Sequence, residues 1–159
     1  MIYTYKQIIN LMKYVYTDGS CKRNGKTNPD AGIGIYFGDD DSRNVSKKIY
    51  GKQTNNSAEL SAIIEVFDII KDEIEQGEKY TIVTDSEYVI KCVSTYGEKM
   101  DKINWKKDIP NKELVQKAYL KYKNIPNITF MHVMAHTNAK SIHAVGNAQA
   151  DKLATLATN

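Results

Sequence analysis

The chain has 159 residues, a net charge of +3 and a hydrophobic fraction of 42%. This length predicts one domain with an ordinary buried core, and the composition is typical of soluble, globular proteins. The small positive charge permits a nucleic-acid partner but does not indicate one. Two cysteines argue against a disulfide framework or a zinc site, no apolar run approaches the roughly 18 residues of a membrane span, and the N-terminus lacks the layout of a secretion signal. We therefore expect a monomeric protein inside the cell, in the cytoplasm or nucleus, with no contact to membranes.

The N-terminal half of the chain is predicted to begin with an extension and to continue as a β-meander. Residues 1–12 form the extension, to which we assign no function, and residues 13–159 form the domain. Strands are predicted over residues 13–17, 32–37 and 44–50, with polar turns between them. Three sequential strands with short connections favour antiparallel pairing. The acidic run 39–41 is interpreted as a solvated hairpin tip rather than as a metal site.

The C-terminal half is predicted to alternate helices and strands. Apolar side chains recur at helical spacing over residues 57–75, which predicts a long helix. Further strands are predicted over 79–84 and 128–134, and further helices over 86–95, 111–123 and 147–157. Because a helical crossover precedes each later strand, we expect these strands to be parallel to the first. The predicted fold class is α/β, with a five-stranded mixed sheet whose first three strands are antiparallel and which helices flank.

Four acidic residues stand at positions that favour a shared site. Asp18 and Asp85 follow predicted strands, whereas Glu59 and Asp151 lie on predicted helices. Ligands gather at the carboxyl ends of parallel strands, and His136 follows the fifth strand toward the same edge. Carboxylates brought together repel one another unless a cation holds them, and oxygen ligands select Mg²⁺ or Mn²⁺. A carboxylate cluster that binds two such ions can cleave a phosphodiester.

A lysine-rich stretch surrounds Trp105, the single tryptophan of the chain. Its lysines are Lys99, Lys102, Lys106, Lys107 and Lys112. The stretch is either a solvated helix face or an electrostatic contact to a phosphate backbone, and the sequence leaves both interpretations open. Trp105 itself is predicted to be a core residue.

Short motifs along the chain occur in a recognisable order. They are Thr17-Asp18-Gly19-Ser20, Asn24-Gly25, Gln53-Thr54-Asn55-Asn56, Ala58-Glu59-Leu60, Thr84-Asp85-Ser86, Asn104-Trp105-Lys106, Gly146-Asn147 and Ala150-Asp151. By these motifs the chain, from about residue 13 to residue 158, resembles ribonuclease H of type 1, an endonuclease that cuts RNA in RNA–DNA hybrids. The resemblance implies the RNase H-like fold, two Mg²⁺ ions (Mn²⁺ in their place), an RNA–DNA hybrid as partner, and products with 5′-phosphate and 3′-hydroxyl ends.

The resemblance also implies roles for individual residues. The metal ligands would be Asp18, Glu59, Asp85 and Asp151, with Asp18 bridging both ions. His136 would assist proton transfer or product release, although His143 in the same segment is an alternative. Substrate-binding positions would be Asn24, Asn55 and Asn56 in the minor groove, Lys52, Thr54 and Asn111 around a DNA-strand phosphate, and Tyr88 and Tyr96. The family position at Lys52 is often arginine, and lysine keeps the charge but loses the bidentate fork.

The sequence departs from the family where tryptophans usually face a DNA sugar. Tyr96 and Met100 stand at the aligned positions, so we expect Tyr96 and its neighbours to pack on that sugar. Two other functions are weighed against a ribonuclease H. One is another nuclease of the same fold, such as a junction resolvase or a domain detached from a reverse transcriptase. The other is a non-catalytic hybrid-binding module, which the presence of all four acids disfavours.

Overall fold

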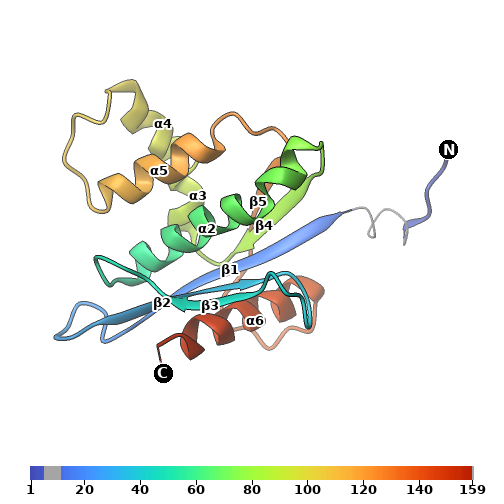
Figure 1. Cartoon of the computed structure of the whole chain (residues 1–159), viewed down its shortest axis with the longest axis horizontal. Helices are drawn as coiled ribbons and strands as arrows, with labels where there is room; N and C mark the ends of the chain where they lie inside the picture. Colours follow the sequence, from blue (N-terminus) through green and yellow to red (C-terminus); the bar gives the residue numbers. More distant parts are fainter. Residues whose placement is uncertain (6–11, 159) are drawn as a thin grey trace.

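A five-stranded mixed sheet forms the centre of the protein (Figure 1). The structure, a computed structural model, describes residues 1–5 and 12–158. The strands are β1 (Lys13–Lys22), β2 (Asp30–Tyr36), β3 (Val45–Lys48), β4 (Tyr80–Thr84) and β5 (Ile128–His132), in the order β3-β2-β1-β4-β5. Strands β1, β2 and β3 are antiparallel neighbours, whereas β4 is parallel to β1 and β5 is parallel to β4. The predicted fold class is confirmed.

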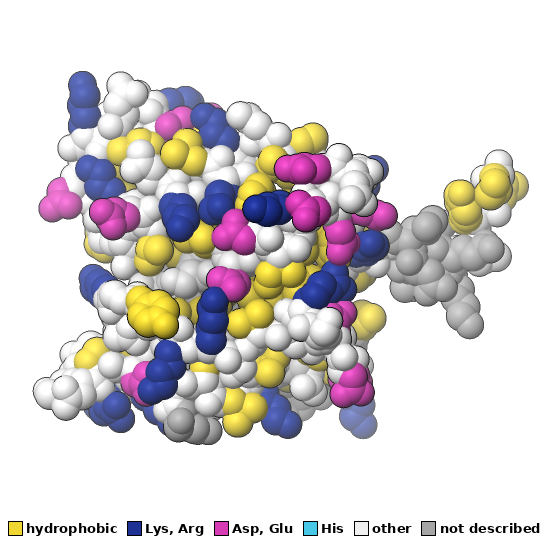
Figure 2. All heavy atoms as spheres, in the orientation of Figure 1, with side chains coloured by type: hydrophobic (Ala, Val, Ile, Leu, Met, Phe, Trp, Pro, Cys, Tyr) yellow, Lys and Arg dark blue, Asp and Glu magenta, His cyan; other side chains and the backbone are white. Residues whose placement is uncertain are grey.

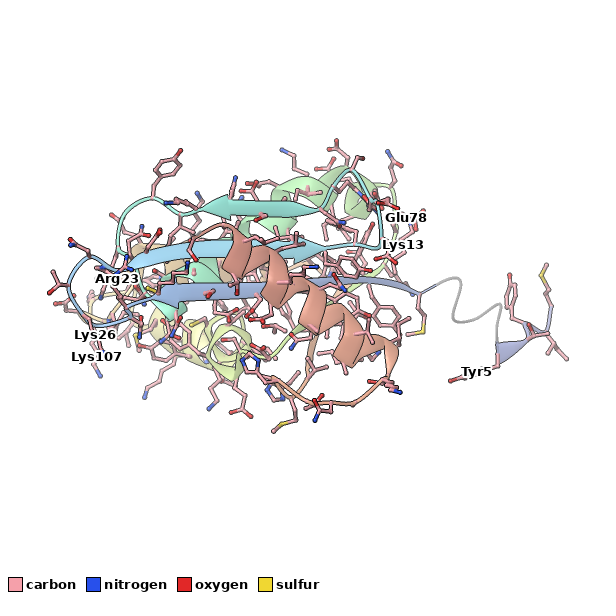
Figure 3. The ribbon with its side chains drawn as sticks, turned by 90° about the horizontal axis from the view of Figure 1, so that it is seen from below. Tyr5, Lys13, Arg23, Lys26, Glu78 and Lys107 are labelled. Atoms are coloured by element: carbon pink, nitrogen blue, oxygen red, sulfur yellow. The ribbon has the colours of Figure 1, made fainter. Side chains whose placement is uncertain are left out.

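Helices cover both faces of the sheet. They are α2 (Asn55–Glu75), α3 (Glu87–Cys92), α4 (Thr95–Lys102), α5 (Lys112–Tyr122) and α6 (Ile142–Leu156). Figure 1 shows α2 to α5 on one side of the sheet and α6 on the other, and Figure 3 shows α6 crossing the strands. The main core lies between the sheet and α2, where the predicted apolar stripe of that helix is buried, as Leu60, Ile63 and Ile70 illustrate.

Strand β1 is longer than predicted, because its second half pairs on one side alone. Its parallel register with β4 ends at Thr17↔Thr84, but its antiparallel register with β2 continues to Lys22↔Asp30. Asp18 therefore lies inside a strand, at the first position beyond the parallel ladder, and not at the strand's end as predicted. The sequence Asp-Gly-Ser usually marks a turn, which explains the error.

Capping side chains decide where two helices begin. The Thr54 hydroxyl accepts the Ser57 N–H at 3.0 Å, so α2 begins at Asn55, two residues before its predicted start. Ser141 likewise accepts the Ala144 N–H at 3.2 Å, so α6 begins five residues earlier than predicted. Asn111 occupies the N-cap position of α5, but its backbone is left-handed and its side chain makes no capping hydrogen bond. Thr54 and Ser141 thus follow the general preference of helix starts for side-chain acceptors, whereas Asn111 does not.

Two other predicted boundaries are wrong. The helix predicted over 86–95 ends earlier, as α3, and a turn at Val93 and Ser94 separates it from α4, which packs on α5. Gly97 makes this approach possible, because a Cβ there would collide with the Tyr119 ring. Strand β5 ends at His132, so the fifth strand does not reach residue 134.

The N-terminal segment stands apart from the sheet. Residues 1–5 extend away from the domain in Figure 1, and the side chains of Ile2 and Tyr5 are 98% and 81% exposed. The remaining part of the predicted extension, residues 6–11, lies outside the described residues, so its boundary at residue 12 stays a prediction. None of the helices among the described residues is long and apolar enough to cross a membrane.

Candidate metal and catalytic site

Three of the four predicted metal ligands meet beside the centre of the sheet. Carboxylate oxygens of Asp18, Glu59 and Asp85 all lie within 4.8 Å of one another. Asp18 is 4% exposed and Glu59 is 7% exposed, while Asp85 is half-buried. Strand β1, the first turns of α2 and the residue after β4 each contribute one acid. Buried acids without a basic neighbour are rare, so this convergence needs a cation to make it favourable.

The sheet register places Asp18 beside Asp85. Thr17 of β1 pairs with Thr84 of β4, and both acids are the next residues along their parallel strands. A parallel pair carries equivalent positions at the same level, so the two carboxylates leave the ladder together. Of the pairings that the sequence predicts, this parallel one matters most for the site.

Gly19 brings the third acid into reach. A Cβ at this position would collide with the backbone of Ala58 and Glu59, so glycine is what allows α2 to lie directly against β1. The Gly19 N–H also donates a hydrogen bond to the Glu59 carboxylate. The motif around Asp18 thus contains both a ligand and the space that the neighbouring ligand needs.

Asp151 reaches the same cluster from the opposite face of the sheet. Its side chain makes a hydrogen bond with Asp18, although Asp151 is outside the group of three whose oxygens lie within 4.8 Å. A Cβ on Gly34 would collide with the backbone of Ala150, so this glycine lets α6 approach β2 closely. All four predicted ligands are therefore neighbours, with Asp151 at the rim.

Asn147 is a site residue that the sequence analysis quoted without giving it a role. Its amide donates to the Asp85 carboxylate at 3.1 Å, and its side chain is 4% exposed. It precedes Asp151 by four residues, so both side chains project from one face of α6. That spacing was the signal available in the sequence. The His132 ring also contacts the carbonyl oxygen of Asp85, with 3.2 Å between Nε2 and O.

Burial and mutual repulsion raise the pKa values of two acids of the cluster. Burial raises the pKa of Asp18, and the negative charges of Glu59 and Asp85 raise it further. Burial also raises the pKa of Glu59, although hydrogen bonds from Asp18 and Gly19 act against that rise. Both pKa shifts are consistent with a hydrogen bond that a protonated Asp18 donates to Glu59. The Glu59 Oε2 atom is buried and has no hydrogen-bond partner. Divalent cations fit this donor set, because they would replace the proton and complete the bonding of Oε2.

The two candidate histidines lie in different surroundings. His136 is exposed and lines a pocket of about 50 Å³ together with Asn147 and Asp151. His143 instead lies among aromatic side chains, with its Nδ1 3.0 Å from the Tyr16 hydroxyl and its ring 4.7 Å from the Tyr14 ring. This placement supports His136 over His143 as the histidine beside the acids, and its catalytic role stays a prediction.

The predicted groove-binding asparagines form an exposed group. The side-chain oxygen of Asn24 accepts the backbone N–H of Asn55 at 3.0 Å, which joins the β1–β2 turn to the start of α2. Asn55 and Asn56 are both exposed in the first turn of that helix, a few residues before Glu59. The three residues are therefore placed to touch a ligand that also reaches the acids.

The predicted phosphate-binding residues are brought together in part. Lys52 and Asn111 line an open pocket of about 340 Å³ with Tyr50 and Lys112. Thr54 does not line this pocket, because its hydroxyl caps α2. Tyr88 is half-buried, and its hydroxyl forms a hydrogen bond with Asn111.

The aromatic residues that follow β4 are largely core residues. Trp105 is 6% exposed, as predicted, and Met100 is 2% exposed and cannot face a substrate. Tyr96 is half-buried and packs against the core. Lysines of the same stretch are exposed, with the exception of the half-buried Lys112, and Lys102 lies 3.4 Å from Glu98. Figure 2 shows Lys and Arg side chains interspersed with acids over the visible face. A phosphate contact by these lysines stays a prediction.

Comparison with known proteins agrees with this arrangement. The family model for RNase H matches residues 11–159. A ribonuclease H of Schizosaccharomyces pombe is 37% identical over 145 residues, which cover 88% of this chain and 50% of that protein. A ribonuclease H of Clostridium botulinum is 30% identical, with 88% of this chain and 91% of that protein covered. The crystal structure of LC11-RNase H1 in complex with an RNA/DNA hybrid is 26% identical with a TM-score of 0.55, and covers 91% of this chain and 95% of its own.

The match extends over the whole sheet and all the helices described above. This chain spans about half the length of the first curated relatives that it matches, and nearly the full length of the bacterial one. Since the family model matches residues 11–159, a range that contains all four acids of the cluster, the chain belongs to the RNase H family.

Proposed function

We propose that this chain is an endonuclease that hydrolyses the RNA strand of RNA–DNA hybrids with two divalent ions, Mg²⁺ or Mn²⁺. The observation that carries the proposal is the buried set of Asp18, Glu59 and Asp85, with an unpartnered oxygen on Glu59. Support comes from the relatives, which are named ribonuclease H, and from the solved structure of LC11-RNase H1 with an RNA/DNA hybrid. The expected products carry 5′-phosphate and 3′-hydroxyl ends.

The four acids would hold the ions. Asp18 would be the ligand common to both ions, because it interacts with Glu59, Asp85 and Asp151 alike. When bound, two such ions supply a water of lowered pKa and stabilise charge on the departing oxygen. Asn147 holds the Asp85 carboxylate through its amide, which orients a ligand without adding charge.

His136 would handle a proton at the edge of the site. It is exposed beside Asp151, and histidine is the side chain that most often transfers a proton in enzymes. Such a group can donate a proton to the departing 3′ oxygen or loosen the product. Its location outside the buried cluster makes it an assisting residue rather than an indispensable one.

Selection of the hybrid would use two separate surfaces. Asn24, Asn55 and Asn56 lie where they can contact the 2′-hydroxyls of an RNA strand in the minor groove. Lys52 and Asn111 lie in one pocket, where they can hold a phosphate of the DNA strand. Thr54 acts on this surface indirectly, by capping the helix that presents the asparagines.

One incubation tests the proposal. Labelled RNA–DNA hybrid, RNA duplex, DNA duplex and a four-way DNA junction are each mixed with the protein, in Mg²⁺ and in chelator. We expect cleavage of the RNA strand of the hybrid in Mg²⁺ alone, with ends that a 5′-phosphatase and a kinase assay identify. Equal cutting of DNA duplex, or undiminished cutting in chelator, would contradict the proposal. Tight binding of the hybrid without cleavage would identify a non-catalytic module.

A further inference from the structure

Tyr50 is an aromatic side chain in an unusual position. Its side chain is 98% exposed. Among the described residues, Tyr3 and Tyr5 are the other aromatic side chains classed as exposed, and both belong to the N-terminal segment that stands apart from the domain. Tyr50 is therefore the one exposed tyrosine, phenylalanine or tryptophan ring among the described residues of the domain itself. Its apolar surface is exposed to solvent and packs against no other part of the protein.

The backbone around Tyr50 is held firmly. The Gln53 side-chain amide donates to the carbonyl oxygens of both neighbours, Ile49 and Gly51, at 3.0 Å each. The Ile49 N–H donates to the carbonyl of Ala31 in β2 at 3.1 Å, and the Ala31 N–H donates to Gln53 at 2.8 Å. These bonds fasten the segment to the sheet, so the ring is presented from a fixed backbone.

The neighbours of Tyr50 are those of an anion site. It lines the 340 Å³ pocket with Lys52, Asn111 and Lys112, and the lining also includes one acid, Glu113, so that two basic residues face one acidic residue. Two ammonium groups and an amide can hold a phosphate, and a flat aromatic ring beside them can pack on the apolar face of the adjoining nucleotide. One pocket thus has groups for both the charged and the uncharged part of a nucleic-acid strand.

The helix region that is expected to contact the DNA sugar offers no comparable ring. Met100 and Trp105 are buried, and Tyr96 is half-buried against the core. A strand whose phosphate lies at Lys52 and Asn111 would therefore meet Tyr50 as the available aromatic surface.

We propose that Tyr50 is a substrate-binding residue that packs its ring against a deoxyribose of the DNA strand, next to the phosphate held by Lys52 and Asn111. The inference rests on the proposed function, because it takes the hybrid as the ligand. A deoxyribose suits the ring, since a ribose would bury a 2′-hydroxyl against an apolar face without a hydrogen-bond partner.

The test measures hybrid binding and cleavage in parallel. Affinities are measured by fluorescence anisotropy in an Asp18→Asn background, and KM and kcat in the otherwise native enzyme. We expect Tyr50→Ala to weaken hybrid binding about fivefold or more, the lower range for base–aromatic stacking. KM should rise with kcat nearly unchanged, and the salt dependence of binding should keep its slope, because no charge is lost. Tyr50→Phe and Tyr50→Trp should restore affinity, and Tyr5→Ala should be neutral.

Each other result has a distinct meaning. If wild type cleaves the hybrid but Tyr50→Ala keeps its affinity and KM, Tyr50 is not a contact residue and the proposed function is unaffected. If Tyr50→Phe loses as much affinity as Tyr50→Ala, the hydroxyl acts rather than the ring. An equal loss of affinity for hybrid and for RNA duplex would overturn the deoxyribose assignment. Failure of wild type to bind or cleave the hybrid would refute the proposed function itself.

Discussion

The two ends of strand β1 carry charged side chains in opposite arrangements. At the amino end, the Lys13 ammonium lies 3.2 Å from Glu73 and 3.5 Å from Glu78, and Figure 3 shows Lys13 and Glu78 close together there. In the second half of the strand, Asp18 has two other acids, Glu59 and Asp85, as its neighbours. Opposite charges neutralise one another within the protein, whereas a buried group of like charges requires a ligand of the opposite charge.

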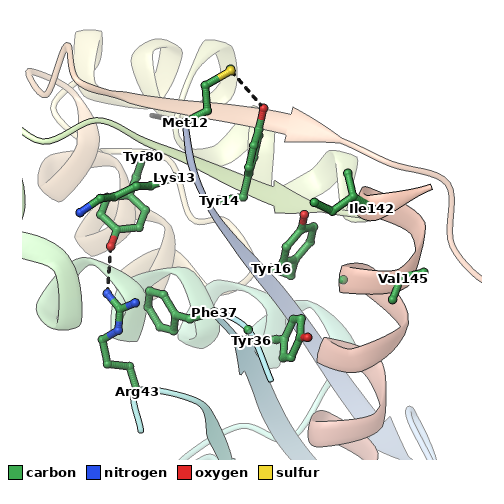
Figure 4. A pocket seen from close by; sticks show the side chains of 12 residues that line it. Met12, Lys13, Tyr14, Tyr16, Tyr36, Phe37, Arg43, Tyr80, Ile142 and Val145 are labelled. Atoms are coloured by element: carbon green, nitrogen blue, oxygen red, sulfur yellow. Dashed lines mark hydrogen bonds between the residues drawn. The ribbon is translucent and has the colours of Figure 1, made fainter. Parts of the chain in front are cut away.

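The amino end also contains the larger cavity. A space of about 520 Å³ lies between β1, β2 and the start of α6, with aromatic walls that include Tyr14, Tyr36 and Phe37 (Figure 4). Of its two charged residues, Lys13 pairs with Glu73, and Arg43 donates to Tyr80 at 2.9 Å and to Glu73 at 3.0 Å. Size alone would favour this cavity as the functional site, but its polar groups already have partners. At the acid cluster, Asp151 lines a space of only about 50 Å³, but a buried oxygen of Glu59 has no hydrogen-bond partner.

The same difference appears in the protonation of the acids. Although burial acts to raise the pKa of Glu73, hydrogen bonds from Tyr80 and Lys13 outweigh it and lower this pKa. For Asp18, burial and the charge of Glu59 act together and raise the pKa. The fold therefore favours the charged form of Glu73 and disfavours the charged form of Asp18.

The largest expected effect comes from removing the charge at the centre of the acid cluster. We expect Asp18→Asn to reduce hybrid cleavage to background, because the bridging ligand is lost, while metal-free stability stays equal or increases through relief of repulsion. Cleavage rates in Mg²⁺ and thermal unfolding in chelator measure the two effects. Asp40→Asn, at an exposed left-handed position, is the matched control. A near-normal cleavage rate in Asp18→Asn would rule out the bridging role.

The two candidate histidines, His136 and His143, lie in different places: His136 lies beside the acid cluster and His143 beside Tyr16. We expect His136→Ala to slow turnover by roughly 10²-fold without abolishing it, the usual scale for a lost proton-transfer group. His143→Ala should leave turnover nearly unchanged and lower stability by about 1 kcal/mol, because it removes a hydrogen bond to Tyr16. Single-turnover rates at saturating Mg²⁺ and denaturant unfolding separate the two. Slower product formation in His143→Ala alone would reverse the assignment.

The metal-free protein should lose stability as pH rises. The ordinary pKa of Asp18 is 3.8, and the folded value is raised, so the folded state binds more protons than the unfolded state. The stabilising contribution is fully present below the ordinary pKa and is lost as pH rises through the folded value. Unfolding in chelator between pH 5 and 8 should show this decline, with a smaller one in Asp18→Asn.

Added Mg²⁺ and the variant Glu73→Gln, at the amino end of β1, are the controls for this pH dependence. Added Mg²⁺ should reverse the decline, because it binds the ionised folded state. Glu73→Gln should leave the decline in place, since the lowered pKa of Glu73 contributes stability that is present above its ordinary pKa of 4.5 and is lost only in acid. If the stability of the metal-free wild type does not depend on pH, the pKa of Asp18 is not raised in the folded state.

The smallest expected effect concerns one surface charge. We expect Lys52→Ala to weaken hybrid binding to a similar degree for all sequences and to reduce the salt slope of binding by about one phosphate contact. Lys13→Ala is the control, because Lys13 is already paired with Glu73 at the opposite end of the sheet. Anisotropy titrations at several salt concentrations measure both slopes. Equal slopes for Lys52→Ala and wild type would remove Lys52 from the phosphate pocket.

Local patterns predicted much of this molecule. Hydrophobic spacing identified α2 and every strand of the sheet, and helical crossovers predicted the parallel pairing that places Asp18 beside Asp85. Boundaries were less accurate, because they depend on partners. Strand β1 continues beyond a turn-like sequence because β2 pairs with it, and α6 begins early because Ser141 caps it.

What the sequence determined by itself is the set of strands, the directions in which they pair and the choice of the four acids as candidate ligands. These depend on short-range patterns and on motifs, which a linear chain displays directly. Only the tertiary structure decided that Thr54 caps a helix, that Asn147 holds Asp85 and that His143 lies with Tyr16. It also decided that Met100 is buried while Tyr50 is exposed. Burial and hydrogen-bond partners are properties of residues far apart in the chain, so they exist only once the sheet and helices have packed.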